Sequence, residues 1–494
     1  MQRHQKLILS ATIAILLFLF WYKGFPYMLT FQEQNQLFLF NWDYLLQSLS
    51  VSGGLADYIA EFVTQFFLFP WAGAILLAIL LITLQLLSFR LFKGKDWYCL
   101  SFLPSAAMLV MMGDHDIMLC YLVGMILALA LSLAYRRFPS VYFAILAIPA
   151  AFWLIGPAAW LFVLYLIIHN RKWQSLLYIP YSFALLYLAS RTVLCQYPWR
   201  QILLGLDYFR MPMMQPTLFL LPLASAALAM LLGNLLPSPK RKLAVEIATM
   251  LAICIASGLG IARSYDRTGA YQVISYDQMV RFEKWEDIIE MSKKYQPNSQ
   301  LSSVCVNMSL CITGQMDKFS QFNQYGVQGL VMPRVRDNIS NSATSEVFWR
   351  LGLINESLRY AFDTQESIPN LRKSGRWMSR MAECQILNGR PQVASKYLDI
   401  LGESLFYRKW ARQKKELLEN PALIMQDPVY SYLLSVRLDE DFLFYYPEFG
   451  KILYKMYLEN KNNYMAAWYL QVWMEMVKNS NANETVSDYS VHGS

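Results

Sequence analysis

Long apolar runs alternate with short polar segments over the first half of the chain, and this pattern predicts a bundle of membrane-spanning helices. Seven runs have about the 17–25 residues that cross a bilayer. They lie at residues 7–21, 69–91, 97–112, 117–135, 175–194, 217–236 and 243–262.

An eighth run, residues 141–168, is too long for one ordinary span and is interrupted by Ile155-Gly156-Pro157. Because Gly-Pro breaks a helix, the run is interpreted as a tight pair of short helices. The total is then nine crossings. A broken helix persists in a bilayer only where protein or a water-filled cavity satisfies its free backbone groups, so we expect a cavity near Gly156.

The distribution of Lys and Arg predicts the orientation of the bundle. With the N-terminus inside, twelve basic residues fall on the inner flanks, and only Lys23, Arg191, Arg200 and Arg210 fall on the outer side. An odd number of spans then places everything after residue 262 outside the cytoplasm. The first run lacks a small-residue cleavage site and should remain as a signal anchor.

The first outer loop, residues 24–69, is too long for a simple turn and contains a predicted helix at residues 55–67. Asp57, Glu61 and Gln65 recur every four residues on this helix, with apolar residues around the rest of it. We interpret it as an interfacial helix whose carboxylates face water. The alternative is a helix that fills a groove among the spans.

The composition becomes charged and helical after Arg263, where paired helices separated by turn residues and prolines are predicted between residues 276 and 401. Each pair has about the size of a tetratricopeptide repeat, although no unit has the full signature. The sequence therefore predicts an all-α protein with three segments. A polytopic membrane domain occupies residues 1–263, an extracytoplasmic tetratricopeptide-like helical-hairpin array residues 264–478, and a disordered polar tail residues 479–494.

Composition narrows the class of protein. With 56% hydrophobic and 16% charged residues, the chain is too apolar for a wholly soluble enzyme. The net charge of +8 is accounted for by the inner flanks, so it does not indicate nucleic acid. The cysteines have no metal-ligand spacing, which argues against zinc, and a disulfide among Cys305, Cys311 and Cys384 stays open.

The chain contains no Gly-rich phosphate loop, HExxH or GxSxG motif, so no soluble-enzyme motif defines a site. The remaining candidates are ionisable residues on the predicted outer face. They are Glu33 and Asp43 in the first loop, Asp114, His115 and Asp116 in the second, and Arg191, Arg200 and Arg210 around the fourth. The acidic turn would suit Mg²⁺ or Mn²⁺, or would simply be the polar part of a short loop. The arginines would anchor to lipid phosphates or form a fork for a phosphate or pyrophosphate group.

Three segments resemble an uncharacterised family of multi-span inner-membrane proteins of Bacteroidota with helical-repeat tails. They read FQEQNQLFLFNWDY, SGGLADYIAEFVTQFFLFPW and GDHDIMLCYLV. The layout is also similar, more distantly, to membrane-embedded glycosyltransferases that use lipid-phosphate sugar donors. That resemblance implies Glu33 as catalytic base and Asp114 or Asp116 as the residue that assists metal or acceptor binding. Asp43, which lies with Glu33 in the first loop, is a further catalytic candidate. The sequence has Gln32-Glu33-Gln34 where that family commonly has paired acids.

Together these features predict a glycosyltransferase-like protein of the bacterial inner membrane that acts on a lipid-linked substrate, such as a glycan, at the periplasmic face. The membrane lipids are its expected surroundings. The alternatives are a membrane-anchored scaffold whose helical array recruits a protein partner in envelope biogenesis, and a transporter or flippase.

Overall fold

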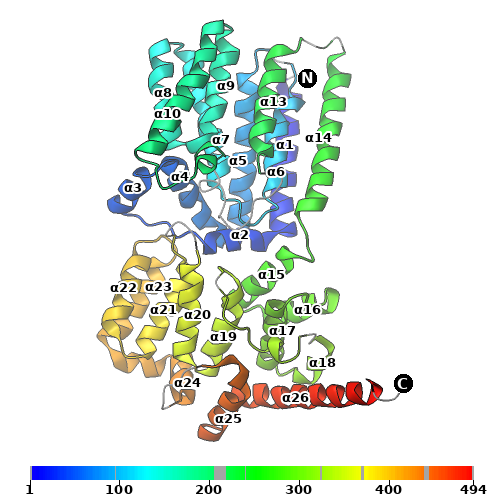
Figure 1. Cartoon of the computed structure of the whole chain (residues 1–494), viewed down its shortest axis with the longest axis vertical. Coiled ribbons are helices and arrows are strands. Elements are labelled where there is room, and N and C mark those ends of the chain that lie inside the picture. Colours follow the sequence, from blue (N-terminus) through cyan, green and yellow to red (C-terminus); the bar gives the residue numbers. More distant parts are fainter. Residues whose placement is uncertain are drawn as a thin grey trace. The chain divides into compact units, whose positions relative to one another are not determined.

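The computed structural model describes residues 3–94, 96–204, 219–237, 239, 241–322, 325–335, 337–368, 372–438 and 444–491. The chain divides into two compact units, Met1–Asp266 and Arg267–Ser494, called here the N-terminal and C-terminal units. Their boundary lies within a few residues of the composition change at Arg263. Every regular element in the described ranges is a helix (Figure 1), which confirms the all-α prediction.

The N-terminal unit contains long, roughly parallel helices joined by shorter ones (Figure 1). In chain order they are α1 (Arg3–Leu19), η1 (Phe20–Gly24), α2 (Pro26–Gln34), α3 (Trp42–Leu49), α4 (Gly54–Thr64), η2 (Gln65–Leu68), α5 (Pro70–Leu91), η3 (Cys99–Phe102), α6 (Leu103–Met111), α7 (Cys120–Arg137), α8 (Val141–Leu154), η4 (Gly156–Ala158), α9 (Ala159–Asn170), η5 (Trp173–Leu177), α10 (Tyr178–Arg191), α11 (Trp199–Leu204), α13 (Leu221–Leu235) and α14 (Lys242–Ser264).

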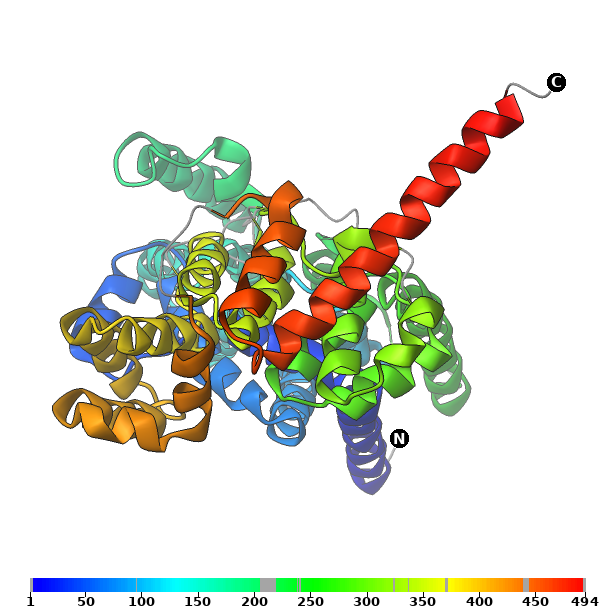
Figure 2. The ribbon, with the colours of Figure 1, turned by 90° about the horizontal axis from the view of Figure 1, so that it is seen from below.

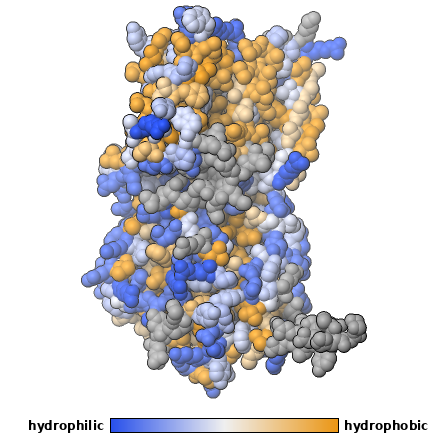
Figure 3. Space-filling view, viewed as in Figure 1, coloured by the Kyte–Doolittle hydropathy of each residue, from blue (hydrophilic) through white to orange (hydrophobic). Residues whose placement is uncertain are grey.

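Four helical segments of this unit are long and apolar enough to cross a membrane: Arg3–Gly24, Pro70–Leu91, Cys120–Arg137 and Lys242–Ser264. Shorter apolar helices occupy Cys99–Met111, Val141–Leu154, Gly156–Asn170 and Leu221–Leu235. Apolar side chains cover much of the visible face of the unit (Figure 3). A count of nine crossings stays a prediction.

The predicted break between α8 and α9 is present, and the first loop covers it. Gly156 is buried with φ of 74°, a conformation that favours glycine. The carbonyl oxygen of Phe152 accepts a hydrogen bond from Ser52 Oγ at 3.0 Å, and that of Trp153 accepts one from Gly53 N at 2.7 Å. Protein groups therefore satisfy these two carbonyls, and the cavity expected near Gly156 stays a prediction.

Helix α4 presents its acidic face to the protein, so the water-facing interpretation is wrong. Glu61 is 4% exposed and accepts a hydrogen bond from the Tyr44 hydroxyl of α3, while Gln65 is 6% exposed. Phe62 is exposed instead, and α4 packs against α7. The burial of Glu61 and Gln65 favours the alternative of a groove-filling helix, although Asp57 is half-buried. The tyrosine hydroxyl supplies the donor that lets the Glu61 carboxylate be buried.

Glu246 of α14 caps the start of η3. Its two carboxylate oxygens accept hydrogen bonds from Tyr98 N at 2.6 Å and Cys99 N at 2.7 Å, and the residue is 4% exposed. The first N–H groups of a helix have no partner within the helix and carry partial positive charge. A buried carboxylate is therefore satisfied here by backbone donors.

The C-terminal unit is built from shorter helices. They are α15 (Ala270–Arg281), α16 (Trp285–Lys294), α17 (Gln300–Ile312), η6 (Met316–Lys318), α18 (Phe319–Phe322), η7 (Gly326–Gly329), α19 (Ser340–Leu351), α20 (Ile354–Glu366), α21 (Gly375–Leu387), α22 (Pro391–Gly402), α23 (Arg408–Glu419), η8 (Pro421–Gln426), α24 (Pro428–Val436), η9 (Tyr446–Glu448), α25 (Phe449–Glu459) and α26 (Tyr464–Val491).

Consecutive helices from α19 to α23 each pack against the next, as do α25 and α26. The predicted pairs around residues 276–295, 346–366 and 376–401 correspond to α15/α16, α19/α20 and α21/α22, whereas α23 and α24 were not predicted. Whether the array is tetratricopeptide-like stays a prediction. Helix α26 extends beyond the other helices of this unit (Figure 2) and continues to Val491, over part of the segment where a disordered tail was expected. Cys305, Cys311 and Cys384 are free thiols.

Candidate functional site

The helix that carries Glu33 packs against the predicted acidic turn. Helix α2 begins with Pro26 at its first position, and Glu33 lies in its last turn with 3% exposure. Gln32, its neighbour, donates from Nε2 to the carbonyl oxygen of Ile117 at 2.9 Å. The ring of Phe31 lies 5.7 Å from that of His115. Residues about eighty positions apart in sequence are thus brought to one place.

The acidic turn is held by its own side chains. Asp114 Oδ1 accepts a hydrogen bond from Asp116 N at 3.0 Å, which is the local geometry that aspartate favours in turns. His115 Nε2 lies 3.6 Å from Asp116 Oδ1, and Asp116 is 4% exposed. These contacts give Asp114 and His115 structural roles in the turn.

The metal prediction for Asp114, His115 and Asp116 gains no geometric support. Among the described residues, no group of three or more His, Cys, Asp or Glu side chains is placed to hold a metal ion. One oxygen of the Asp114 carboxylate instead accepts a hydrogen bond from the backbone of its own turn.

The other predicted residues lie on different elements. Asp43 is exposed in the first turn of α3, where a helix favours acidic residues, and α3 packs on α4. Arg191 is exposed in the last turn of α10, with its guanidinium 5.3 Å from the ring centre of Tyr187. Arg200 belongs to α11, but its side chain, like all of Arg210, lies outside the described residues.

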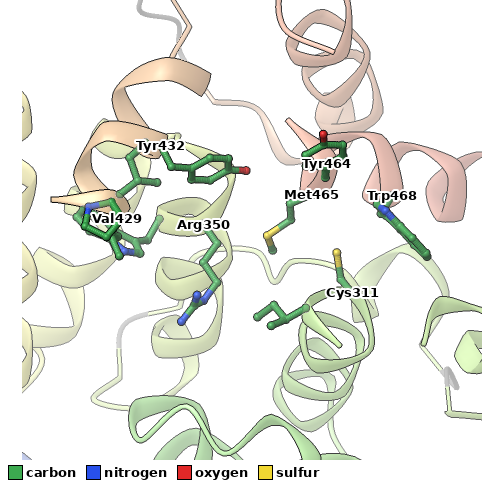
Figure 4. Close-up of a pocket in the computed structure, with 11 residues that line it drawn as sticks. Cys311, Arg350, Val429, Tyr432, Tyr464, Met465 and Trp468 are labelled. Carbon is green, nitrogen blue, oxygen red and sulfur yellow. The ribbon is translucent and has the colours of Figure 1, made fainter. Parts of the chain in front are cut away.

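A groove of about 450 Å³ in the C-terminal unit was not predicted (Figure 4). Helices α17, α19, α24 and α26 form its walls. It is lined by Cys311, Ile312, Trp349, Arg350, Pro428, Val429, Tyr432, Leu433, Tyr464, Met465 and Trp468. The available signal was the aromatic spacing of Tyr464 and Trp468, which places both rings on one face of a helix. No local pattern shows that four separate helices contribute to one groove.

A second cavity, of about 270 Å³, is lined mainly by charged side chains of α15, α19 and α21, with Tyr407 and Trp410. Arg376 Nη1 contacts Asp277 Oδ2 at 2.9 Å, and Arg380 Nη2 contacts Glu346 Oε2 at 2.7 Å. Arg380 also lies 3.3 Å from Glu383 Oε2. The charges at this cavity are therefore largely neutralised by one another.

The pKa values of two glutamates in this network shift in opposite directions. Burial raises the pKa of Glu346, but the attraction of Arg380, Arg376 and Arg350 exceeds that effect, and its pKa lies below the usual 4.5. For Glu383, burial outweighs the attraction of Arg380 and Lys414, so its pKa lies above 4.5. Arginines that hold a carboxylate ionised and buried are expected of a structural network, and we interpret the cluster in this way.

Comparison with known proteins identifies a family to which no activity is assigned. No curated protein and no solved structure matches the chain significantly. A family described as "Family of unknown function (DUF6057)" matches residues 3–482. This confirms the prediction of an uncharacterised family that covers nearly the whole chain, whereas the Bacteroidota source and the glycosyltransferase resemblance stay predictions. The chain belongs to the DUF6057 family.

Proposed function

We propose that the protein is a membrane-anchored binding protein, in which the N-terminal unit provides the anchor and the C-terminal unit recruits a protein partner. The observation that carries this proposal is the aromatic groove between α17, α19, α24 and α26. Several of its side chains are exposed although they are large and apolar, including Val429 at 52% and Tyr464 at 68%. Clustered exposed apolar side chains are typical of interaction sites.

The proposal extends to location. The basic residues on the inner flanks favour a bacterial inner membrane protein with its C-terminal unit in the periplasm. A periplasmic reporter fused after Ser264 should be active, and a cytoplasmic reporter at the same site inactive. The reverse result would place the groove in the cytoplasm and remove envelope partners from consideration.

Site-specific photo-crosslinking in intact cells tests partner binding directly. A photoreactive amino acid at Val429 should give an adduct with a defined protein. The matched control is Tyr454 of α25, which is 54% exposed and does not line the groove. Trp468→Ala should reduce the adduct at position 429 without lowering membrane abundance. Equal adducts at both positions, or adducts with lipid alone, would contradict the proposal.

A second candidate is the glycosyltransferase-like enzyme, supported by the packing of α2 against the turn that contains Asp114. In this alternative, Glu33 takes a proton from an acceptor hydroxyl of a lipid-linked substrate, with Mg²⁺ or Mn²⁺ at the turn. Glu33→Gln should then lower turnover by about 10²–10⁴-fold, as expected for loss of a catalytic base, and Asp114→Asn should also lower turnover. Asp57→Asn, on the neighbouring α4, is the control. Lipid-linked glycans that are unchanged in a deletion strain would remove this candidate.

A further inference from the structure

The groove of the C-terminal unit has the residue types of a peptide-binding site. Trp349, Tyr432, Tyr464, Trp468, Met465 and Arg350 all line it. Trp, Tyr, Met and Arg are the residues enriched at the cores and energetic hot spots of protein interfaces. Its volume of about 450 Å³ lies in the range of about 300–1,000 Å³ that holds compact ligands. The lining therefore fits one or two large apolar side chains of a polypeptide.

Arg350 adds a positive charge to this apolar lining. Among the described residues that line the groove, it is the only charged one. In the close-up, Arg350 and Tyr432 lie on one side and Cys311, Met465 and Trp468 on the other (Figure 4). The guanidinium lies 4.6 Å from the ring centre of Trp285, a cation–π contact. Charge complementarity thus favours an acidic group beside the apolar side chains.

Glu283 makes the direct ion pair with Arg350, whose charge also helps to lower the pKa of Glu346. Glu283 Oε1 lies 2.6 Å from Arg350 Nη2, but the Glu283 side chain is 65% exposed. Exposed ion pairs contribute only about 0–1 kcal/mol, because water competes for both charges. A carboxylate delivered with an apolar side chain in the groove is able to share or replace this contact, since the apolar burial adds to its affinity.

From these contacts we infer that the groove binds a partner segment in which an aromatic or branched aliphatic side chain stands next to an aspartate or glutamate. The apolar side chain enters between Trp468 and Tyr432, and the acidic group binds Arg350. This inference rests on the proposed binding function and specifies the chemistry of the partner.

A display selection tests the inference even though the partner is unidentified. The full chain in lipid nanodiscs is exposed to a library of random twelve-residue peptides, and empty nanodiscs are used for subtraction. Sequencing should show enrichment of an aromatic or aliphatic residue adjacent to Asp or Glu, and this enrichment should disappear with Trp468→Ala. A basic consensus, or an enrichment that Trp468→Ala leaves intact, would overturn the inference.

The charge contact has its own test, which uses the best selected peptide and its Asp→Asn or Glu→Gln counterpart. Arg350→Gln should lower the affinity for the acidic peptide by about tenfold, as expected for loss of a charge-assisted hydrogen bond. Glu283→Gln should raise this affinity, because the competing carboxylate is removed. The affinity for the amide counterpart should change with neither variant.

Two further variants separate binding from folding. Arg350→Lys keeps the charge and should retain more affinity than Arg350→Gln. Arg359→Gln removes an arginine from α20 that pairs with Glu356 and should leave binding unchanged. A lower affinity for the acidic peptide in the Glu283→Gln variant would overturn the acidic specificity. If crosslinking at Val429 captures a partner while the selection yields a non-acidic consensus, this inference fails but the proposed function stands.

Discussion

The two units hold their buried carboxylates in different ways. In the N-terminal unit, Glu61 is satisfied by a tyrosine hydroxyl and Glu246 by two backbone N–H groups. In the C-terminal unit, Glu346 lies between Arg376 and Arg380. A charged partner is costly in an apolar bundle, whereas the more charged sequence of the second unit supplies arginines that pair with carboxylates. For these carboxylates, the first unit relies on neutral hydrogen-bond donors. The second unit adds charge balance to such donors, since Glu383 accepts a hydrogen bond from the Tyr430 hydroxyl at 3.0 Å as well as lying beside Arg380.

The largest effect should come from removing one arginine of the charge network. Arg380→Met leaves Glu346 and Glu383 without their closest cation, and breaking a buried pair costs about 3–5 kcal/mol. Unfolding of the purified protein in denaturant, followed by tryptophan fluorescence, measures this change. Lys451→Met, which breaks an exposed ion pair with Glu448, should change the free energy of unfolding by less than about 0.5 kcal/mol. A comparable loss in both variants would remove the distinction between the two kinds of pair.

Glu246→Gln should destabilise the N-terminal unit by about 2 kcal/mol, because hydrogen bonds to charged groups contribute about 1.5–3 kcal/mol. The amide keeps one acceptor oxygen for Tyr98 N and Cys99 N but loses the second oxygen and the charge. Thermal unfolding in detergent measures the loss. The control is Thr249→Val on the same helix, whose hydroxyl bonds only to Val245 O of α14 among the described contacts. An unchanged melting temperature for Glu246→Gln would show that one neutral acceptor oxygen is sufficient for these N–H groups.

Ser52→Ala tests the contact between the first loop and the break after α8. It removes one neutral hydrogen bond, to Phe152 O, and should cost about 1 kcal/mol. Ser50→Ala removes an exposed, local hydrogen bond to Gln47 O and serves as the control. Protease cleavage in the loop should increase for the first variant only.

The smallest effect is a difference in pH dependence between two variants. The pKa of Glu346 is depressed in the folded state, so its contribution to stability is present above pH 4.5 and is lost as the pH falls through the folded pKa. The pKa of Glu383 is raised, so its contribution is present below pH 4.5 and is lost as the pH rises through the folded pKa. The destabilisation caused by Glu346→Gln should therefore grow with pH, and that caused by Glu383→Gln should shrink. Slopes of the same sign in a pH series of unfolding experiments would contradict this assignment.

Local patterns predicted the elements better than their environments. The Ile155-Gly156-Pro157 break and the helix pairs after residue 270 depend on neighbouring residues, and both were predicted correctly. The four-residue spacing of Asp57, Glu61 and Gln65 defined a helix face but not whether it is buried, since Tyr44 supplies the donor from another helix. The packing of α2 on the acidic turn and the groove around Arg350 depend on contacts between distant segments, which no single stretch of sequence encodes.

The contact between the first loop and the end of α8 also bears on biosynthesis. Ribosomes make the chain from its N-terminus, so Ser52 and Gly53 already exist when residues 141–170 are made. The carbonyl groups of Phe152 and Trp153 can therefore find their partners as soon as this segment folds. In a circular permutant that begins after the first loop, the broken segment would be made before those partners, and the yield should fall even if the finished structure is unchanged.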